Sequence, residues 1–163
     1  MRITDKYVLF WKDKLGNWSK TPGIKYAGLV FPTSEHLFMY LKAMYFGDIK
    51  TAADILTTSS PRIAKDLGRN VDHFDEAAWS LYREEAMYLA VLCRYRNDPD
   101  FREEINNPEY KGKSFVEANP YDKIWAIGLS EDSKEAESEE TWHGMNLLGK
   151  TLNKLRNAIK YLD

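Results

Sequence analysis

A helical pattern of some twenty residues limits the folds open to this chain more than any other feature. After Asp75, which can cap a helix, apolar residues recur at steps of three and four. They are Trp79, Tyr82, Ala86, Leu89 and Cys93. This stripe predicts a long helix that crosses the core, so the other elements must pack around it.

Shorter helices are predicted on both sides of the long one, each from apolar residues at helical spacing. The expected ranges are 34–46, 49–57, 61–67, a short helix from 98–99, and a last helix from 145 to 162. In the third of these, Pro61 occupies the first turn and Gly68 lies just past the expected end.

Short strands are predicted from runs of β-branched and aromatic residues. Strands are expected at 7–11 and 25–31, and strands or extended segments at 114–118 and 124–127. No repeat and no regular alternation of strand and helix is visible, and 163 residues suit one domain. The sequence therefore predicts a single compact α+β domain over 1–163, mainly helical, with a few short strands.

Charge is unevenly distributed along the chain. Residues 130–141 hold six acids and one lysine, which predicts an acidic surface loop. Because the whole chain has a net charge of −2, the remainder carries +3, which tolerates phosphate-bearing ligands but is too weak for a dedicated nucleic-acid binder. No signal peptide or membrane-length apolar run is visible, so we expect a cytoplasmic protein with no membrane partner.

Two charged residues of the predicted 34–46 helix are candidates for chemistry. Glu35 and Lys42 are seven residues apart and return to nearly the same face. They share an edge with Phe38 and Tyr45, so they could point into a partly desolvated pocket. Alternatively, Glu35 complements the helix dipole and Lys42 extends its ammonium group to water.

A second group of candidates surrounds a proline turn at 115–128. Asn119, Asp122 and Trp125 lie there within apolar sequence, where sites are often found. The alternative is a turn in which Asn119 and Asp122 bond local backbone groups. Trp79 on the long helix is either buried packing or a surface on which a base stacks.

Residues 142–149 lie before and at the start of the last helix. Trp142 and Asn146 could cap this helix or line a cleft, and Gly144 and Gly149 would allow close approach. The chain has no glycine-rich phosphate loop, no nucleophile elbow and no zinc-protease motif. One cysteine and three scattered histidines exclude a structural zinc site.

Three segments resemble the NADAR, or YbiA-like, family in order and spacing. They are FPTSEHLFMYLKA at 31–43, VEANPYDKIWAIGL at 116–129 and WHGMNLLGKTL at 142–152. The resemblance implies a compact, mostly helical fold and an N-glycosidase, a hydrolase that cleaves the bond between a phosphoribosyl or ADP-ribosyl group and a base or amine. Riboflavin-biosynthesis intermediates and ADP-ribosylated guanine are the expected substrates, with nucleic acid only as the carrier of the latter. No cofactor or metal is expected.

The resemblance also implies roles for individual residues. The family's motif acid falls on Glu35, its motif lysine on Lys42, its helix tryptophan on Trp79, and its second acid on Asp122 beside Trp125. We expect Glu35, Lys42 and Asp122 to be catalytic. The expected substrate-binding residues are Trp79, Trp125, Asn17, Lys20, Asn119, Trp142 and Asn146.

Cleavage of an N-glycosidic bond needs a proton for the departing nitrogen and stabilisation of positive charge at C1. We expect Glu35, kept protonated by partial burial, to be the general acid/base and ionised Asp122 to stabilise C1, although these roles can be swapped. Lys42 either binds ribose hydroxyls or phosphate as a cation, or attacks C1 of a ring-opened ribosylamine to form a Schiff base.

Two other classes of function remain open at this point. The same residues could form a non-catalytic module that binds or sequesters ADP-ribose or other NAD-derived nucleotides. The chain could also be a protein-interaction module that acts through the acidic residues 130–141. Deletion of this segment would then abolish function, and substitution of Glu35 would have no effect.

Overall fold

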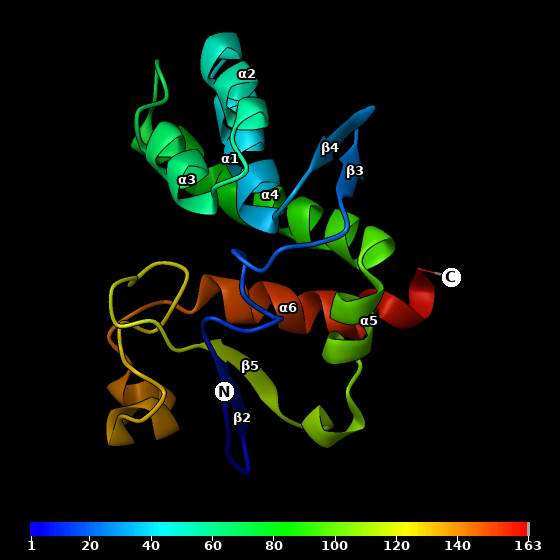
Figure 1. Cartoon of the computed structure of the whole chain (residues 1–163). Coiled ribbons are helices and arrows are strands. Elements are labelled where there is room, and N and C mark those ends of the chain that lie inside the picture. Colours follow the sequence, from blue (N-terminus) through cyan, green and yellow to red (C-terminus); the bar gives the residue numbers. More distant parts are fainter. Residues whose placement is uncertain (163) are drawn as a thin grey trace. The chain divides into compact units, whose positions relative to one another are not determined.

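A computed structural model of the chain describes residues 1–162 (Figure 1). Its contacts divide the chain into two compact units. Unit 1 comprises Met1–Gly16 and the residues from Asp100 onward, and unit 2 comprises Asn17–Pro99.

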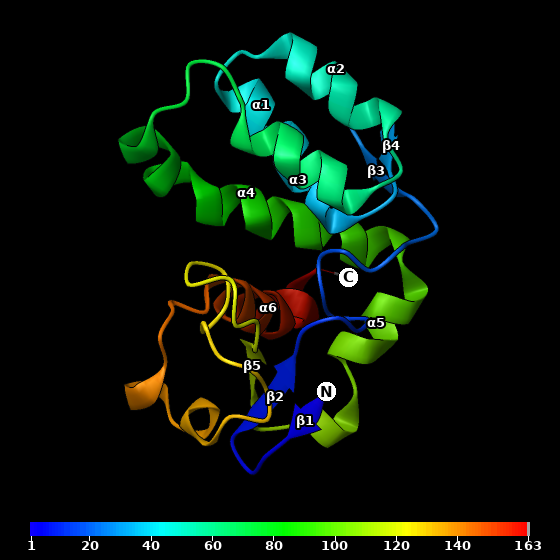
Figure 2. The ribbon, with the colours of Figure 1, turned by 60° about the vertical axis from the view of Figure 1, so that its left-hand side comes forward.

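Unit 2 consists of four helices and a hairpin. The helices are α1 (Ser34–Tyr45), α2 (Ile49–Thr57), α3 (Pro61–Arg69) and α4 (Glu76–Asn97). α1 contacts each of the other three helices, so it is the central element of this unit (Figure 2). The predicted long helix is confirmed as α4, and the three shorter helices begin where the sequence predicts.

Side-chain caps explain where these four helices begin. In each, the residue before the helix accepts a hydrogen bond from the backbone N–H three positions later, which satisfies a group that has no partner within the helix. The capping residues are Thr33, Asp48, Ser60 and Asp75.

Gly68 lies within α3, so the prediction that it follows the end of the helix is wrong. A Cβ atom at this position would lie 2.0 Å from Sδ of Met39 on α1. The glycine therefore serves the close packing of α3 against α1 and does not end the helix.

The strand predicted over 25–31 is a hairpin in the structure. Strand β3 (Ile24–Tyr26) pairs antiparallel with β4 (Leu29–Phe31). The two residues between them, Ala27 and Gly28, both have positive φ angles, of 50° and 77°. Positive φ at both central residues is typical of the tight turn that joins antiparallel strands, and Gly28 adopts it without strain.

Unit 1 is built on a three-stranded sheet with the strand order β1-β2-β5. β1 (Arg2–Ile3) pairs antiparallel with β2 (Tyr7–Phe10), and β2 pairs parallel with β5 (Ser114–Glu117). Helix α6 (Leu147–Ala158) packs on β5, and the two lie side by side in both ribbon views (Figures 1 and 2).

The segment 124–127 is not a strand, contrary to the prediction. Its carbonyl groups, with that of Lys123, accept backbone hydrogen bonds from residues 143–148, which include the first N–H groups of α6. The apolar residues of this segment therefore serve to hold the start of a helix, a long-range pairing that local propensity does not reveal.

The acidic segment has an apolar anchor that its composition does not suggest. It forms two short 3₁₀ helices, η2 (Lys134–Glu137) and η3 (Glu139–Thr141). Ala136 is fully buried in a cluster with Leu9, Val116 and Ile127. Most acidic side chains of residues 130–141 lie outside this cluster and are exposed.

The remaining elements of unit 1 are short helices. They are α5 (Pro99–Ile105), which begins at the last residue of unit 2, and the 3₁₀ turns η1 (Pro108–Tyr110) and η4 (Ile159–Tyr161). Within residues 1–162, none of the helices has the length and apolar character needed to cross a membrane.

Candidate active site

The residues predicted to be functional fall into two groups, one in each unit. Unit 2 holds Glu35, Lys42, Trp79, Asn17 and Lys20. Unit 1 holds Asp122, Trp125, Asn119, Trp142 and Asn146.

One face of α1 carries the charged candidates of unit 2. Glu35, Phe38, Lys42 and Tyr45 follow one another at steps of three and four, so they share this face. The ring centroids of Phe38 and Tyr45 lie 5.5 and 6.3 Å from that of Trp79 on α4. This face of α1 therefore packs against α4 and is not the solvent side of the helix.

Glu35 is a buried carboxylate in the first turn of α1, only 7% exposed. Its backbone N–H donates to the carbonyl oxygen of Asn17 at 3.1 Å. The position at the helix N-terminus is favourable for a negative charge, but an acid that served only the dipole would remain in water. Burial thus makes Glu35 more than a first-turn surface acid.

Lys42 is half-buried and lies over aromatic rings. Its Nζ is 4.6 Å from the ring centroid of Phe74 and 5.6 Å from that of Trp79. Burial lowers the pKa of Lys42 below its ordinary value, while the Glu76 and Glu35 carboxylates raise it and Arg69 lowers it further. The amine consequently loses its proton more readily than that of an exposed lysine.

Trp79 belongs to an aromatic cluster, which we define as Phe38, Tyr45, Phe46, Phe74, Trp79 and Tyr82. Within it the rings of Tyr45 and Tyr82 are stacked, with centroids 4.5 Å apart, and both are at least partly exposed. Trp79 itself is buried, as its place on the helix stripe predicts. The partly exposed rings offer a surface to an incoming base, with Trp79 behind them.

Sequence reasoning missed Phe74, although a signal for it exists. Phe74 precedes the cap Asp75, and Trp79 is the fourth residue of α4. An apolar pair at these two positions is the spacing of a hydrophobic staple. That pattern could have placed Phe74 beside Trp79, and hence beside Lys42.

Two buried polar atoms near Glu35 have no hydrogen-bond partner in the described part of the chain. They are Oδ1 of Asn17 and Oγ of Ser34, the residue before Glu35. The amide nitrogen of Asn17 is engaged with Sδ of Met87 at 3.4 Å. Unsatisfied buried polar atoms are uncommon and often mark functional positions, so a ligand hydroxyl or amine could complete these two. Lys20 is exposed.

In unit 1, Asp122 and Asn119 organise the turn after β5. One carboxylate oxygen of Asp122 accepts hydrogen bonds from the backbone N–H groups of Ile124 and Trp125, each at 2.8 Å. Oδ1 of Asn119 accepts from the N–H of Tyr121 at 2.9 Å. Bonds of this kind, from side chain to local backbone, are the alternative to a functional role that the sequence analysis gives for Asn119 and Asp122. They hold the Asp122 carboxylate in place, and its side chain remains partly exposed.

Trp142 and Asn146 have structural partners. The indole N–H of Trp142 donates to the carbonyl oxygen of Ala136 at 3.0 Å, and its ring lies 5.4 Å from that of Tyr7. Asn146 is buried, with its Oδ1 accepting from the N–H of Glu117 and its Nδ2 donating to the carbonyl oxygen of Phe115. The Asn146 amide thus completes the open edge of β5.

Replacing Asn146 by alanine is expected to lower the free energy of unfolding by about 2–4 kcal/mol. Two buried backbone groups of β5 lose their partners, and alanine tolerates the positive φ of 53° at this position less well than asparagine. Thermal denaturation should show a melting temperature roughly 5–15 °C lower. Asn157→Ala, on the exposed end of the same helix, should change it little, and equal melting temperatures for the two variants would contradict this role.

Comparison with known proteins gives the family. The family model described as the NADAR domain matches residues 7–160. The chain belongs to the NADAR domain family. This confirms the predicted resemblance, which came from three short segments of the sequence.

Two named proteins are similar in sequence to this chain over most of its length. N-glycosidase R617 of Acanthamoeba polyphaga mimivirus is 32% identical over 165 residues, which covers 94% of this chain and 96% of that protein. Protein irg-1 of Caenorhabditis elegans is 37% identical over 133 residues, 80% of this chain but only 62% of the worm protein, less than two thirds of its length.

The NMR structure of the E. coli protein YbiA matches this fold with a TM-score of 0.75 and 26% sequence identity. The match covers 99% of this chain and 90% of the YbiA chain. The predicted fold class, α+β and mainly helical, is confirmed.

Proposed function

We propose that this chain is an N-glycosidase that hydrolyses the bond between a ribosyl group and a base or amine. Family membership and the relatives named N-glycosidases support this class of hydrolase. The observation that carries the proposal is that buried Glu35 and half-buried Lys42 lie on the same face of α1, the face that meets the aromatic cluster.

Glu35 is the proposed general acid. The departing nitrogen must receive a proton as the C1–N bond breaks, and a carboxyl group held away from water is suited to carry one. After the base leaves, the resulting carboxylate can take a proton from the attacking water. The swapped assignment, in which Asp122 carries the proton, remains the alternative.

Lys42 is proposed to act as the nucleophile. Its neutral amine would attack C1 of the ring-opened ribosylamine, forming the Nζ–C1 bond, and the C1–N bond to the base would break as Glu35 donates a proton. Water then adds to C1 of the resulting Schiff base, the Nζ–C1 bond breaks, and the sugar leaves. The pKa of Lys42, lowered by burial, supports this duty over a purely cationic one.

Asp122 is proposed to stabilise positive charge at C1, and Trp125 and Asn119 to bind substrate beside it. These assignments rest on the sequence motif. The partly exposed carboxylate, fixed by two backbone N–H groups, is compatible with the role. The proposed substrate-binding set is completed by Trp79, Asn17, Lys20, Trp142 and Asn146. The side chains of Trp142 and Asn146 already hydrogen-bond the backbone, so we expect these two residues to act indirectly.

The proposed substrate class is a phosphoribosyl or ADP-ribosyl compound. Candidates are phosphoribosylamino intermediates of riboflavin biosynthesis and ADP-ribose attached to guanine. The aromatic cluster can stack a base, and the unsatisfied oxygens of Asn17 and Ser34 can bond ribose hydroxyls or exocyclic amines. Release of free base from such a compound by the purified chain tests this function.

The two duties of Lys42 predict opposite pH profiles. As a nucleophile the amine must be neutral, so the limb of the profile set by Lys42 should rise as the pH passes its lowered pKa. As a cation the amine must be protonated, so that limb should fall over the same range.

Borohydride reduction during turnover should add the mass of the reduced sugar to the peptide that contains Lys42. Lys42→Met should show no such adduct. Its melting temperature should not fall, because burial disfavours the charged amine at neutral pH. Turnover without any adduct, together with a falling pH profile, would contradict the covalent step.

The alternative is a module that binds ADP-ribose or related nucleotides without cleaving them. A buried carboxylate and a partly desolvated lysine on one face of α1 favour turnover, since perturbed ionisable groups are typical of catalytic sites. A binder would return its ligand intact after prolonged incubation.

A further inference from the structure

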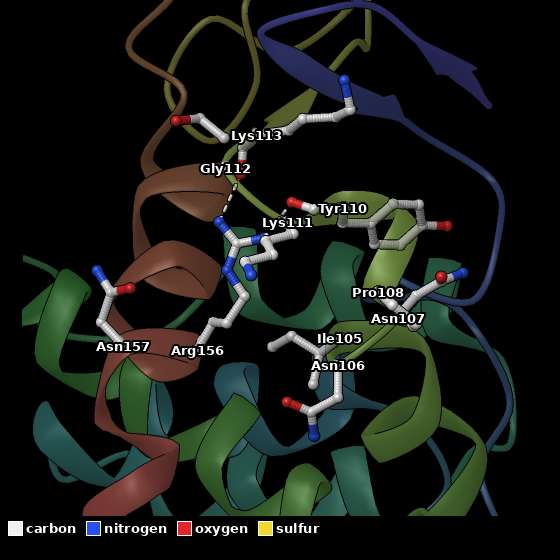
Figure 3. A pocket seen from close by; sticks show the side chains of 11 residues that line it. Ile105, Asn106, Asn107, Pro108, Tyr110, Lys111, Gly112, Lys113, Arg156 and Asn157 are labelled. Atoms are coloured by element: carbon white, nitrogen blue, oxygen red, sulfur yellow. Dashed lines mark hydrogen bonds between the residues drawn. The ribbon is translucent and has the colours of Figure 1, made fainter.

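A pocket of about 510 Å³ opens in unit 1 among the end of α5, the turn that follows it, and the last turn of α6 (Figure 3). This volume is within the range of small-molecule sites. Its lining includes three cationic residues, Lys111, Lys113 and Arg156, and no acidic residue. None of these residues has a role in the proposed glycosidase reaction.

Arg156 reaches into this pocket from α6 and has donors to spare. It donates to the carbonyl oxygens of Tyr110, at 3.2 Å, and of Lys113, and its guanidinium lies 4.4 Å from the ring centroid of Phe115. A guanidinium has five N–H groups, so three remain for another partner. Burial lowers the pKa of Arg156, and no carboxylate in the described residues forms an ion pair with it. A partly desolvated cation without a counter-charge is costly and favours an arriving anion.

Lys111 adds a second cation to the same space. In Figure 3 its ammonium group extends toward the guanidinium of Arg156, and the two residues line the same pocket. Lys111 is exposed, and its ammonium group forms no hydrogen bond or ion pair within residues 1–162. Lys113 differs, because its ammonium donates to the carbonyl oxygens of Thr4 and Asp5 and so is already engaged.

We propose that this pocket binds a phosphate or diphosphate group of a small molecule, held between Arg156 and Lys111. The planar guanidinium matches two phosphate oxygens at once, and a dianion balances the two convergent charges. The side-chain amide of Asn157, exposed beside Arg156, can donate a further bond. The group can come from the phosphoryl part of an N-ribosyl substrate or from a separate phosphorylated compound.

Calorimetric titration of the full chain with inorganic pyrophosphate and with ADP, at low ionic strength, tests the site without requiring turnover. We expect wild type to bind both, and Lys111→Glu to bind at least roughly tenfold more weakly, with an unchanged melting temperature. Lys150→Glu makes the same charge change on an exposed part of α6 outside the pocket, and should bind like wild type. Absence of pyrophosphate binding to wild type, or equal binding by the two variants, would overturn the proposal.

The same variants distinguish the two sources of the phosphate. If the pocket holds the substrate's own phosphate, Lys111→Glu raises KM with kcat unchanged, and pyrophosphate competes with substrate. If it holds a separate compound, KM is unchanged and pyrophosphate still binds to protein saturated with substrate. Because binding is measured directly, failure of the glycosidase function would leave this test intact.

Discussion

Replacing Glu35 by glutamine is expected to lower kcat by about 10³-fold, with little change in KM. Glutamine fills nearly the same volume and keeps the backbone bond to Asn17, but it cannot give a proton to the departing nitrogen. Since the side chain is buried, no water can readily replace it as the acid. Steady-state release of free base measures the effect, and a melting curve shows that the fold is kept.

Glu84→Gln is the matched control for this substitution. Glu84 is an exposed acid of α4, so the same loss of charge should leave kcat within about twofold of wild type. If Glu35→Gln retained full activity, the swapped assignment with Asp122 as the acid would be preferred. If activity fell only in proportion to a loss of folded protein, Glu35 would be a structural residue.

Asp122→Asn is expected to lower kcat by roughly 10²-fold without lowering the melting temperature. The amide oxygen of asparagine can still accept the N–H groups of Ile124 and Trp125, so the turn is kept and only the charge is removed. The substitution therefore removes the negative charge proposed to stabilise C1 and leaves the backbone of the turn in place.

Asp122→Ala separates the turn from the charge. It removes both backbone acceptors as well, and should lower the free energy of unfolding by about 1–2 kcal/mol in addition to the loss of activity. Asp122→Asn with wild-type activity and Asp122→Ala with reduced stability alone would show that Asp122 serves only the turn.

Local patterns in the sequence predicted the helices of unit 2 well. Caps such as Thr33 and Asp75, and the steps of three and four after them, act within a few residues of each other, so they can be recognised without the fold. The strand predicted over 124–127 failed because its carbonyl groups pair with residues 143–148, and no local signal encodes that partner. The hairpin at 24–31 was missed because Ala27-Gly28 is a short turn within a run rich in β-branched and aromatic residues, which the sequence analysis treated as one strand.

The candidate site was predictable to the extent that it lies on one helix. The spacing of Glu35 and Lys42 placed them on a shared face, which the structure has. Their burial, the ring of Phe74 beneath Lys42 and the unsatisfied oxygen of Asn17 depend on packing between segments distant in sequence. The pocket proposed to bind phosphate also joins distant segments, 105–108 and 110–114 with 156–157, so neither part of the sequence alone indicates it.

Product analysis distinguishes a glycosidase from a binding module. Wild type is incubated with a phosphoribosylaminouracil and, separately, with DNA that carries ADP-ribosylated guanine, and the products are separated and weighed by mass spectrometry. We expect wild type to release the free base, or to restore unmodified guanine, with at least one of the two substrates, and Glu35→Gln to do neither. Both substrates intact, with ligand retained on the protein, would contradict the glycosidase and indicate the binding module.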